Sequence, residues 1–154
     1  MKALLQRVSQ ASVTIQGETT AHISSGVLVL LGIDRQDTEA TAALLARKTA
    51  HLRLFEDEAG KMNLSALDLN KAFLVVSQFT LCADLRKGRR PSFAQACPPE
   101  LAKPLYDCFC AQLRQCGLCV AEGVFQAEMQ VQLVNDGPVT FWLDSAFWET
   151  SSAE

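Results

Sequence analysis

Histidine is scarce in this sequence: only His22 and His51 are present, and neither lies in a recognisable catalytic or metal-binding motif. A Ser-His-Asp site or a zinc-hydrolase site that uses histidine would need one of these two residues. The sequence therefore gives no support to either class of hydrolase.

Long hydrophobic segments are also missing. The longest nearly apolar run, Val27–Ile33, is far shorter than the roughly 20 residues that a membrane-spanning helix needs. Residues 1–7 include a lysine, but their apolar stretch is too short for a signal peptide and no small-residue cleavage site follows. We therefore expect a soluble, cytoplasmic protein with no membrane partner.

Positive charge is in slight deficit, with 14 Lys and Arg against 17 Asp and Glu and a net charge of −3. This balance argues against a protein that coats nucleic acid, because such binding needs many contacts from Lys and Arg to phosphate. It leaves room for a local basic patch. The hydrophobic fraction of 49% and the charged fraction of 20% are those of an ordinary globular chain. The length predicts one domain, residues 1–149, followed by a disordered tail, residues 150–154.

Six cysteines are present, and without a secretory signal we expect free thiols rather than disulfides. Cys116 and Cys119 form a CxxC pair that could bind zinc together with Cys108 and Cys110. However, the apolar spacing predicts a helix here, and on a helix Cys108 and Cys110 would lie about 200° apart. The sequence favours free cysteines and no bound metal, with a zinc site as the alternative.

Apolar patterning predicts an alternation of strands with two helices. A first helix should begin at a cap, Asp37 or Thr38, and end near His51. A second should follow Pro98 and end near Gly117, and Pro104 either delays its start to about Lys103 or kinks it. Residues 56–70 are predicted to form a loop. Strands are predicted at 3–8, 12–15, 26–33, 52–55, 72–76, 129–133 and 138–143. This order predicts a mixed α/β fold with both helices on one face of the sheet.

Three segments could carry chemistry, and each has a simpler structural explanation. Ser77–Leu81 follows a buried strand, where polar side chains either form a site or satisfy loop backbone groups. Asn135–Thr140 contains Asp-Gly and is typical of a tight turn, although Pro138 cannot donate to a sheet ladder and suggests an unusual backbone. Arg86–Arg90 contains four cations in five residues, which either form a solvated surface or bind a phosphate backbone.

Taken together, the first two segments resemble the two signature motifs of the D-aminoacyl-tRNA deacylases. Their sequences are Ser-Gln-Phe-Thr-Leu and Asn-Asp-Gly-Pro-Val-Thr. The resemblance runs in the same order and spacing from Met1 to about Leu143. Supporting matches are Leu5–Val8 with Ala11–Val13, Gly60–Leu64, and Arg90–Phe93.

The resemblance implies a β/β/α sandwich with barrel-like sheets and two main helices on one face. It also implies a cytoplasmic homodimer that hydrolyses the ester joining a D-amino acid, or mischarged glycine, to the 3′-terminal adenosine of tRNA. No metal or other cofactor is implied. Cations of the basic segment would contact tRNA phosphates; they are Arg86, Lys87, Arg89 and Arg90.

For substrate selection, the resemblance implies a cis peptide bond between Gly137 and Pro138, whose carbonyls enter the pocket of the other subunit and meet the substrate's ammonium group. An L side chain would then point into main chain and be rejected, whereas a D side chain would point outward. Arg7 and Asn135 would belong to this selection apparatus, and an arginine can hold several carbonyls at once. Two apolar residues would line the adenosine pocket: Phe125 and Met129.

For catalysis, the resemblance implies Ser77, Gln78, Phe79 and Thr80. Thr80 could be a nucleophile, but no His or Lys stands beside it in sequence to activate it. The family instead favours water assisted by the 2′-hydroxyl of the terminal adenosine, with backbone amides near Phe79 stabilising the oxyanion.

The chain departs from the family pattern at Gln126, where a small residue is common, and at Glu128, where Asp is frequent. Two other interpretations remain. One is a related deacylase specific for L-amino acids, with a trans Gly-Pro bond. The other is a nucleic-acid-binding module without enzymatic activity.

Overall fold

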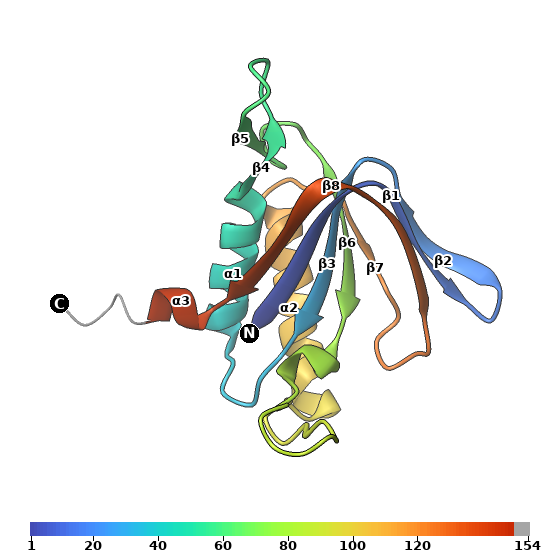
Figure 1. Ribbon diagram of the computed structural model, residues 1–154, viewed down its shortest axis with the longest axis vertical. Coiled ribbons are helices and arrows are strands. Elements are labelled where there is room, and N and C mark those ends of the chain that lie inside the picture. Colours follow the sequence, from blue (N-terminus) through green and yellow to red (C-terminus); the bar gives the residue numbers. More distant parts are fainter. Residues whose placement is uncertain (150–154) are drawn as a thin grey trace.

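The computed structural model describes residues 1–149 and contains one six-stranded mixed sheet that curves into a barrel-like shape (Figure 1). Its strand order is β2-β1-β3-β6-β7, and β8 pairs with β1. The parallel pairs are β3 with β6 and β6 with β7; the other pairs are antiparallel. The strands are β1 (Lys2–Ile15), β2 (Glu18–Ile23), β3 (Gly26–Gly32), β6 (Ala72–Ser77), β7 (Val120–Glu122) and β8 (Gln130–Asp144).

Alternating residues of the sheet enter two hydrophobic clusters, because successive side chains in a strand point to opposite faces. In β3, Val27, Val29 and Leu31 belong to the cluster beneath the helices, whereas Leu28 belongs to the cluster inside the curved sheet. β3 is thus buried on both sides, as its continuous apolar sequence predicts.

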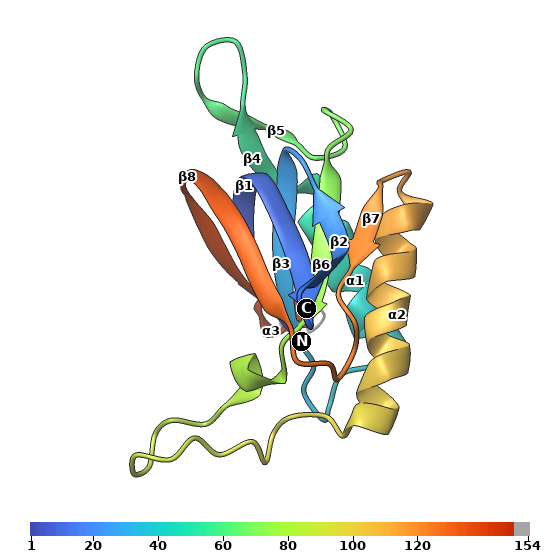
Figure 2. The same cartoon turned by 90° about the vertical axis from the view of Figure 1, so that its right-hand side faces the viewer.

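The two main helices, α1 (Glu39–His51) and α2 (Pro99–Gln115), cover the same face of the sheet (Figure 2). Thr38 caps α1, as predicted, since its hydroxyl accepts the backbone N–H of Thr41 at 3.2 Å. The mixed α/β prediction with two helices on one face is confirmed.

The prediction that Pro104 delays the start of α2 to about Lys103 is wrong, because the helix begins at Pro99 and contains Pro104. The alternative, a kink at Pro104, stays a prediction. A proline here removes the hydrogen bond to the carbonyl of Glu100, which lies in the exposed first turn. The helix ends at the predicted glycine. Gly117 has a φ of 86°, and the Leu118 N–H donates to the Leu113 carbonyl at 3.3 Å. This hydrogen bond pairs a carbonyl in the last turn of the helix.

Several predicted boundaries are wrong. The strand pairs predicted at 3–8 and 12–15, and at 129–133 and 138–143, are two continuous strands, β1 and β8. The predicted loop at 56–70 contains a strand that pairs with the strand predicted near 52–55. Elements that the patterning did not predict are β2, β5, β7, the 3₁₀ helix η1 (Phe79–Cys82) and α3 (Ala146–Glu149). The hairpin outside the main sheet consists of β4 (Arg53–Glu56) and β5 (Met62–Ser65).

All six cysteines are free, as expected. Within residues 1–149, no helix is long and apolar enough to cross a membrane, and no three His, Cys, Asp or Glu side chains are grouped to hold a metal ion. The predicted tail, residues 150–154, lies outside the described residues, and the domain boundary at 149 stays a prediction.

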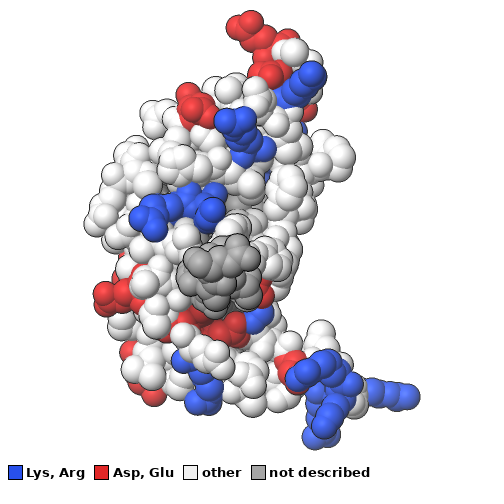
Figure 3. All heavy atoms as spheres, turned by 90° about the vertical axis from the view of Figure 1, so that its left-hand side faces the viewer, with Lys and Arg blue, Asp and Glu red and all other residues white. Residues whose placement is uncertain are grey.

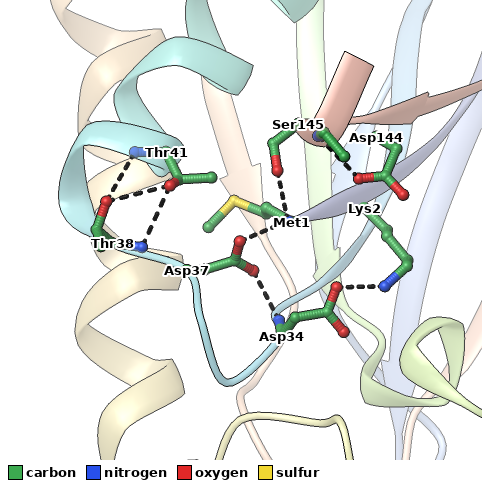
Figure 4. A network of polar contacts seen from close by, with 9 residues as sticks. Met1, Lys2, Asp34, Asp37, Thr38, Thr41, Asp144 and Ser145 are labelled. Carbon is green, nitrogen blue, oxygen red and sulfur yellow. Dashed lines mark hydrogen bonds and ion pairs between the residues drawn. The ribbon is translucent and has the colours of Figure 1, made fainter. Parts of the chain in front are cut away.

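A buried polar network joins the start of β1 to the α1 cap and the end of β8 (Figure 4). The Met1 ammonium donates to the Asp37 carboxylate at 2.5 Å and to the Ser145 hydroxyl at 2.8 Å. The other Asp37 oxygen accepts the Asp34 N–H at 2.7 Å. Burial raises the pKa of Asp37, and the ammonium partly offsets that effect.

Replacing Asp37 with Asn should lower the free energy of unfolding by about 2 kcal/mol, because a buried ammonium loses its charged acceptor. For a chain of this size the melting temperature should fall by roughly 6 °C, measurable by calorimetry. Asp107→Asn is the control, since that carboxylate is half-exposed and pairs with Lys103 on the surface of α2. Equal melting temperatures for the two variants would contradict the stabilising role of the network.

Candidate active site

A cavity of about 480 Å³ opens where β6 ends. There the Gln78 N–H donates to the Leu31 carbonyl at 2.8 Å, and the chain then turns into η1. Ser77, Gln78 and Phe79, three of the four predicted catalytic residues, line this cavity. The remaining lining residues come from β3, α2 and nearby loops: Leu31, Ile33, Phe93, Ala96, Cys97, Pro98, Pro99, Ala102, Phe125 and Gln126.

Aromatic side chains form the walls of this cavity. Phe79, which is 57% exposed, packs edge-on against Phe93 with a centroid distance of 5.0 Å. Phe125 lies 5.8 Å from the ring of Tyr106, whose hydroxyl donates to the Val75 carbonyl. Flat apolar walls of this kind suit the ring of a nucleobase.

Thr80 lies next to this cavity but does not line it. The Gln78 side-chain amide donates to the Thr80 hydroxyl, which fixes both side chains. η1 packs so tightly on β3 that a Cβ at Gly32 would lie 2.9 Å from the Leu81 Cβ. Because the first N–H groups of a helix have no acceptor within it, those of Phe79 and Thr80 are available as hydrogen-bond donors.

Among the described residues, those lining the cavity include no His, Lys, Asp or Glu that could act as a general base. Cys97 is the strongest potential nucleophile among them, but burial raises the pKa of its thiol. A thiol is a far weaker nucleophile than a thiolate. The cavity is thus equipped to position a substrate and to donate hydrogen bonds.

The second predicted motif forms a bulge inside β8, not a turn between two strands. Gln6 pairs with Thr140 and Val8 with Asn135, so four residues of β8, 136–139, lie opposite Arg7 alone. The peptide bond between Gly137 and Pro138 is cis. The Asn135 side-chain amide closes the base of this bulge by donating to the Arg7 carbonyl at 2.9 Å and to the Val139 carbonyl at 3.0 Å.

Arg7 supports the bulge from beneath. Its Nε donates to the Asp136 carbonyl and its Nη1 to the Leu54 carbonyl, each at 2.9 Å. Two carboxylates lie near the guanidinium, that of Asp136 at 3.2 Å and that of Glu56 at 3.8 Å. The side chain of Arg7 is only 8% exposed, so these contacts fix the bulge to β4.

The bulge and the cavity lie at opposite ends of the sheet. Arg7 pairs with Val27, whereas Leu31 pairs with Ser77. Leu31 follows Val27 by four residues of strand, a distance of about 13 Å. In Figures 1 and 2 the β4–β5 hairpin, to which Arg7 is bound, stands above the sheet, and η1 lies below it. One chain therefore does not bring the two motifs together.

Two other groups of predicted residues also lie apart from this cavity. Met129 lies in the cluster inside the curved sheet, and its sulfur would be 2.9 Å from a Cβ at Gly123. The basic segment projects at the lower end of the molecule (Figure 3). Arg86 is engaged there, since its guanidinium donates to the Asp84 carboxylate at 2.7 Å and holds the pKa of that carboxyl well below its usual value.

The sequence interpretation did not assign Cys97 or Ala102 to the site. Both belong to the region where α2 begins, some 20 residues after Ser77, and no local pattern in the sequence brings this region to the end of β6. The sequence does indicate Phe93, because this residue belongs to Arg90–Phe93, one of the segments that resemble the family. Gln126 also lines the cavity with a φ of 63°, a backbone conformation that residues with a Cβ adopt at a cost.

The fold and these two motifs define a family. A family model described as D-Tyr-tRNA(Tyr) deacylase matches residues 4–144, so the chain belongs to that family. Among its relatives is the D-aminoacyl-tRNA deacylase of Thermomicrobium roseum, 62% identical over 95% of both chains. The enzyme of the same name from Roseiflexus sp. strain RS-1 is 58% identical over 96% of both chains.

Two solved structures are similar. One is titled c-Myc DNA Unwinding Element Binding Protein, with a TM-score of 0.88 and 45% identity over 94% of this chain and 98% of that one. The other is a probable eukaryotic D-amino acid tRNA deacylase, with a TM-score of 0.79 over 92% of this chain and 97% of that one. At 19% identity, the second supports the barrel-like fold alone.

Proposed function

We propose that this protein is a cytoplasmic D-aminoacyl-tRNA deacylase. It hydrolyses the ester that joins a D-amino acid, or mischarged glycine, to tRNA, and so proofreads aminoacyl-tRNA. The observation that carries this proposal is the Gly137–Pro138 bulge, which Arg7 and Asn135 hold in one conformation. Membership of the deacylase family supports the proposal.

The active unit is a homodimer in which each bulge enters the cavity of the other subunit. The separation of the two motifs within one chain, about 13 Å along the strands, supports this arrangement. Gly137 and Pro138 are both exposed in β8 and can protrude into a partner. In a two-fold dimer, the bulge of each subunit meets the cavity of the other, so the dimer contains two identical sites.

Selection for the D enantiomer works by exclusion. The carbonyls of Gly137 and Pro138 accept hydrogen bonds from the substrate's ammonium group, and the missing Cβ at Gly137 lets the backbone approach the substrate closely. With the ammonium and the ester fixed, an L side chain would collide with main chain and a D side chain would point to solvent. Glycine has no side chain to reject and is therefore also hydrolysed.

In the reaction, water adds to the ester carbonyl, the resulting oxyanion collapses, and the 3′ oxygen of the terminal adenosine leaves with a proton. The adenosine 2′-hydroxyl assists the water, which is consistent with a cavity lined by no general base. Amides of Phe79 and Thr80 donate to the developing oxyanion. Phe125 contacts the adenine, and Lys87, Arg89 and Arg90 contact phosphates. The role of Met129 in the adenosine pocket stays a prediction.

The amide donor can be tested by replacing Phe79 with Pro. Proline removes this N–H yet is tolerated at the first position of a helix. We expect deacylation to fall by roughly 100-fold, the effect of losing one oxyanion donor. Phe79→Ala keeps the amide and is the matched control for the lost ring. An equally large loss in both variants would assign the effect to the ring.

The alternative role of Thr80 as a nucleophile predicts a different result. Because its hydroxyl accepts from Gln78 and lies beside the cavity, Thr80→Ala should keep substantial deacylase activity. A loss of roughly 1,000-fold in a normally folded variant would instead support covalent catalysis by Thr80. Single-turnover kinetics on D-tyrosyl-tRNA would measure this.

The function itself is tested with D-tyrosyl-tRNA and L-tyrosyl-tRNA incubated with purified protein freed of metal by chelation. We expect rapid release of D-tyrosine while the L ester is spared. Cleavage of the L ester alone would indicate an L-specific relative. Cleavage of neither would overturn the proposal and favour a binding module.

A further inference from the structure

A second and larger hollow, of about 860 Å³, lies between α1 and the end of β8. We call it the α1–β8 groove. It contains both tryptophans of the chain, Trp142 and Trp148, and two further aromatic residues, Phe141 and Phe147. The other lining residues are aliphatic or carry basic nitrogen: Leu44, Leu52, Leu143, Arg47, Lys48, His51 and Arg53.

The charged residues that line the α1–β8 groove are basic. Among the described residues that line it there is no Asp or Glu, although the whole chain is acidic. Arg47 and Lys48 are exposed in the last turns of α1. Arg53 is less available, since it donates to Asn63 at 3.1 Å and its charge lowers the pKa of Asp68. Among the described residues that line the groove, the most available positive charge therefore lies on Arg47 and Lys48.

The aromatic residues are accessible and adjoin these cations. The Lys48 ammonium lies 5.2 Å from the centre of the Trp148 ring, and Phe147 packs edge-on against Trp148 at 5.9 Å. Trp142 is 44% exposed and Phe147 58% exposed. Proteins that bind single-stranded nucleic acid combine rings, on which bases stack, with cations, which pair with phosphates, and the groove offers both. A purely apolar partner would leave Arg47 and Lys48 unpaired.

We infer that the α1–β8 groove binds the acceptor strand of the tRNA substrate, which makes it a second contact outside the reaction cavity. This inference rests on the proposed function. Trp142 follows Pro138 by four residues of β8, about 13 Å. In the proposed dimer, where Pro138 enters the partner's cavity, the groove lies beside that cavity. A strand whose 3′ end occupies one subunit then passes over the groove of the other.

The test compares two substrates, D-tyrosyl-tRNA and the minimal ester D-tyrosyl-adenosine, which lacks the acceptor strand. Reversal of both charges, Arg47→Glu with Lys48→Glu, should lower kcat/KM for the tRNA ester by at least 10-fold and leave the minimal ester unchanged. The dependence of log KM on log salt should become shallower by about 1.4, as expected for two lost phosphate contacts. Trp142→Ala should also act on the tRNA ester alone. The matched control is Lys103→Glu, which reverses an exposed cation on α2.

Equal kinetics of the wild type and the double variant on the tRNA ester would overturn the inference, as would an equal loss on both esters. Sedimentation of each variant adds a third criterion. If the double variant is monomeric and the wild type dimeric, the groove is a contact between subunits and the inference is wrong. If the wild type cleaves neither ester, the proposed function fails, and the groove is then judged by binding of uncharged tRNA, which the double variant should weaken at least 10-fold.

Discussion

Replacing Gly137 with Ala is expected to lower kcat/KM for D-tyrosyl-tRNA by at least ~100-fold, the scale of effect when reacting groups are misplaced by about an ångström. A Cβ at this position would lie 2.7 Å from the Asn135 Oδ1 and 3.4 Å from the Val139 nitrogen. The Asn135 side chain would have to move, and its bonds to the carbonyls of Arg7 and Val139 would be lost. The carbonyls of Gly137 and Pro138, which in our proposal meet the substrate's ammonium, would then shift.

A double-mutant cycle with Asn135→Ala tests this explanation. If Gly137→Ala acts by displacing Asn135, each single variant should lose activity. The double variant should then be no less active than the less active of the two single variants. Additive losses would show that the two residues act independently. Gly17→Ala serves as a control for backbone strain outside both motifs: a Cβ there meets nothing within 4 Å, but the φ of 85° disfavours it, so we expect lower stability with deacylase activity kept. Melting temperatures of the wild type and all four variants separate lost activity from lost folding.

The strands and helices with a strong local signal could be predicted from the sequence. A continuous apolar run, Val27–Ile33, is sufficient to identify a strand buried on both faces. Thr38 and Gly117 mark one end of each main helix through local hydrogen bonds, so residue type predicts the end of α2 and narrows the start of α1 to Asp37 or Thr38.

The continuity of β8 could not be predicted, because it depends on a distant partner. An Asn-Asp-Gly-Pro sequence is typical of a turn, and only pairing with β1 on both sides of Arg7 keeps this segment within one strand. Short edge strands such as β7 also lack a periodic signal, since three residues are too few to show alternation.

The candidate site divides in the same way. Ser77–Thr80 and Gly137–Pro138 could be identified as motifs. The bond from Arg7 to the Leu54 carbonyl and the approach of α2 to Ser77 depend on tertiary packing. The sequence also could not show that the two motifs lie at opposite ends of the sheet within one subunit. In our proposal, this separation is the reason that a second subunit is needed.

A heterodimer of two inactive chains provides the sharpest test of that proposal. One chain carries Gly137→Ala and keeps an intact cavity, whereas the other carries Phe79→Pro and keeps an intact bulge. Because each site in the proposed dimer combines one cavity with the other chain's bulge, the heterodimer has one intact site and one that is doubly defective. We expect about half of the wild-type activity per dimer, since one of the two symmetry-related sites is restored.

Co-expression with two different C-terminal tags, followed by purification on both, isolates this heterodimer. Tags at the other end are avoided, because the Met1 ammonium is bonded to Asp37 and Ser145. The two homodimers, each purified in the same way, set the background. If both motifs acted within one chain, every site in the heterodimer would carry one defect and activity would stay at that background. Failure to recover any doubly tagged protein would equally overturn the shared-site dimer, because a monomer cannot combine a bulge and a cavity that lie at opposite ends of its sheet.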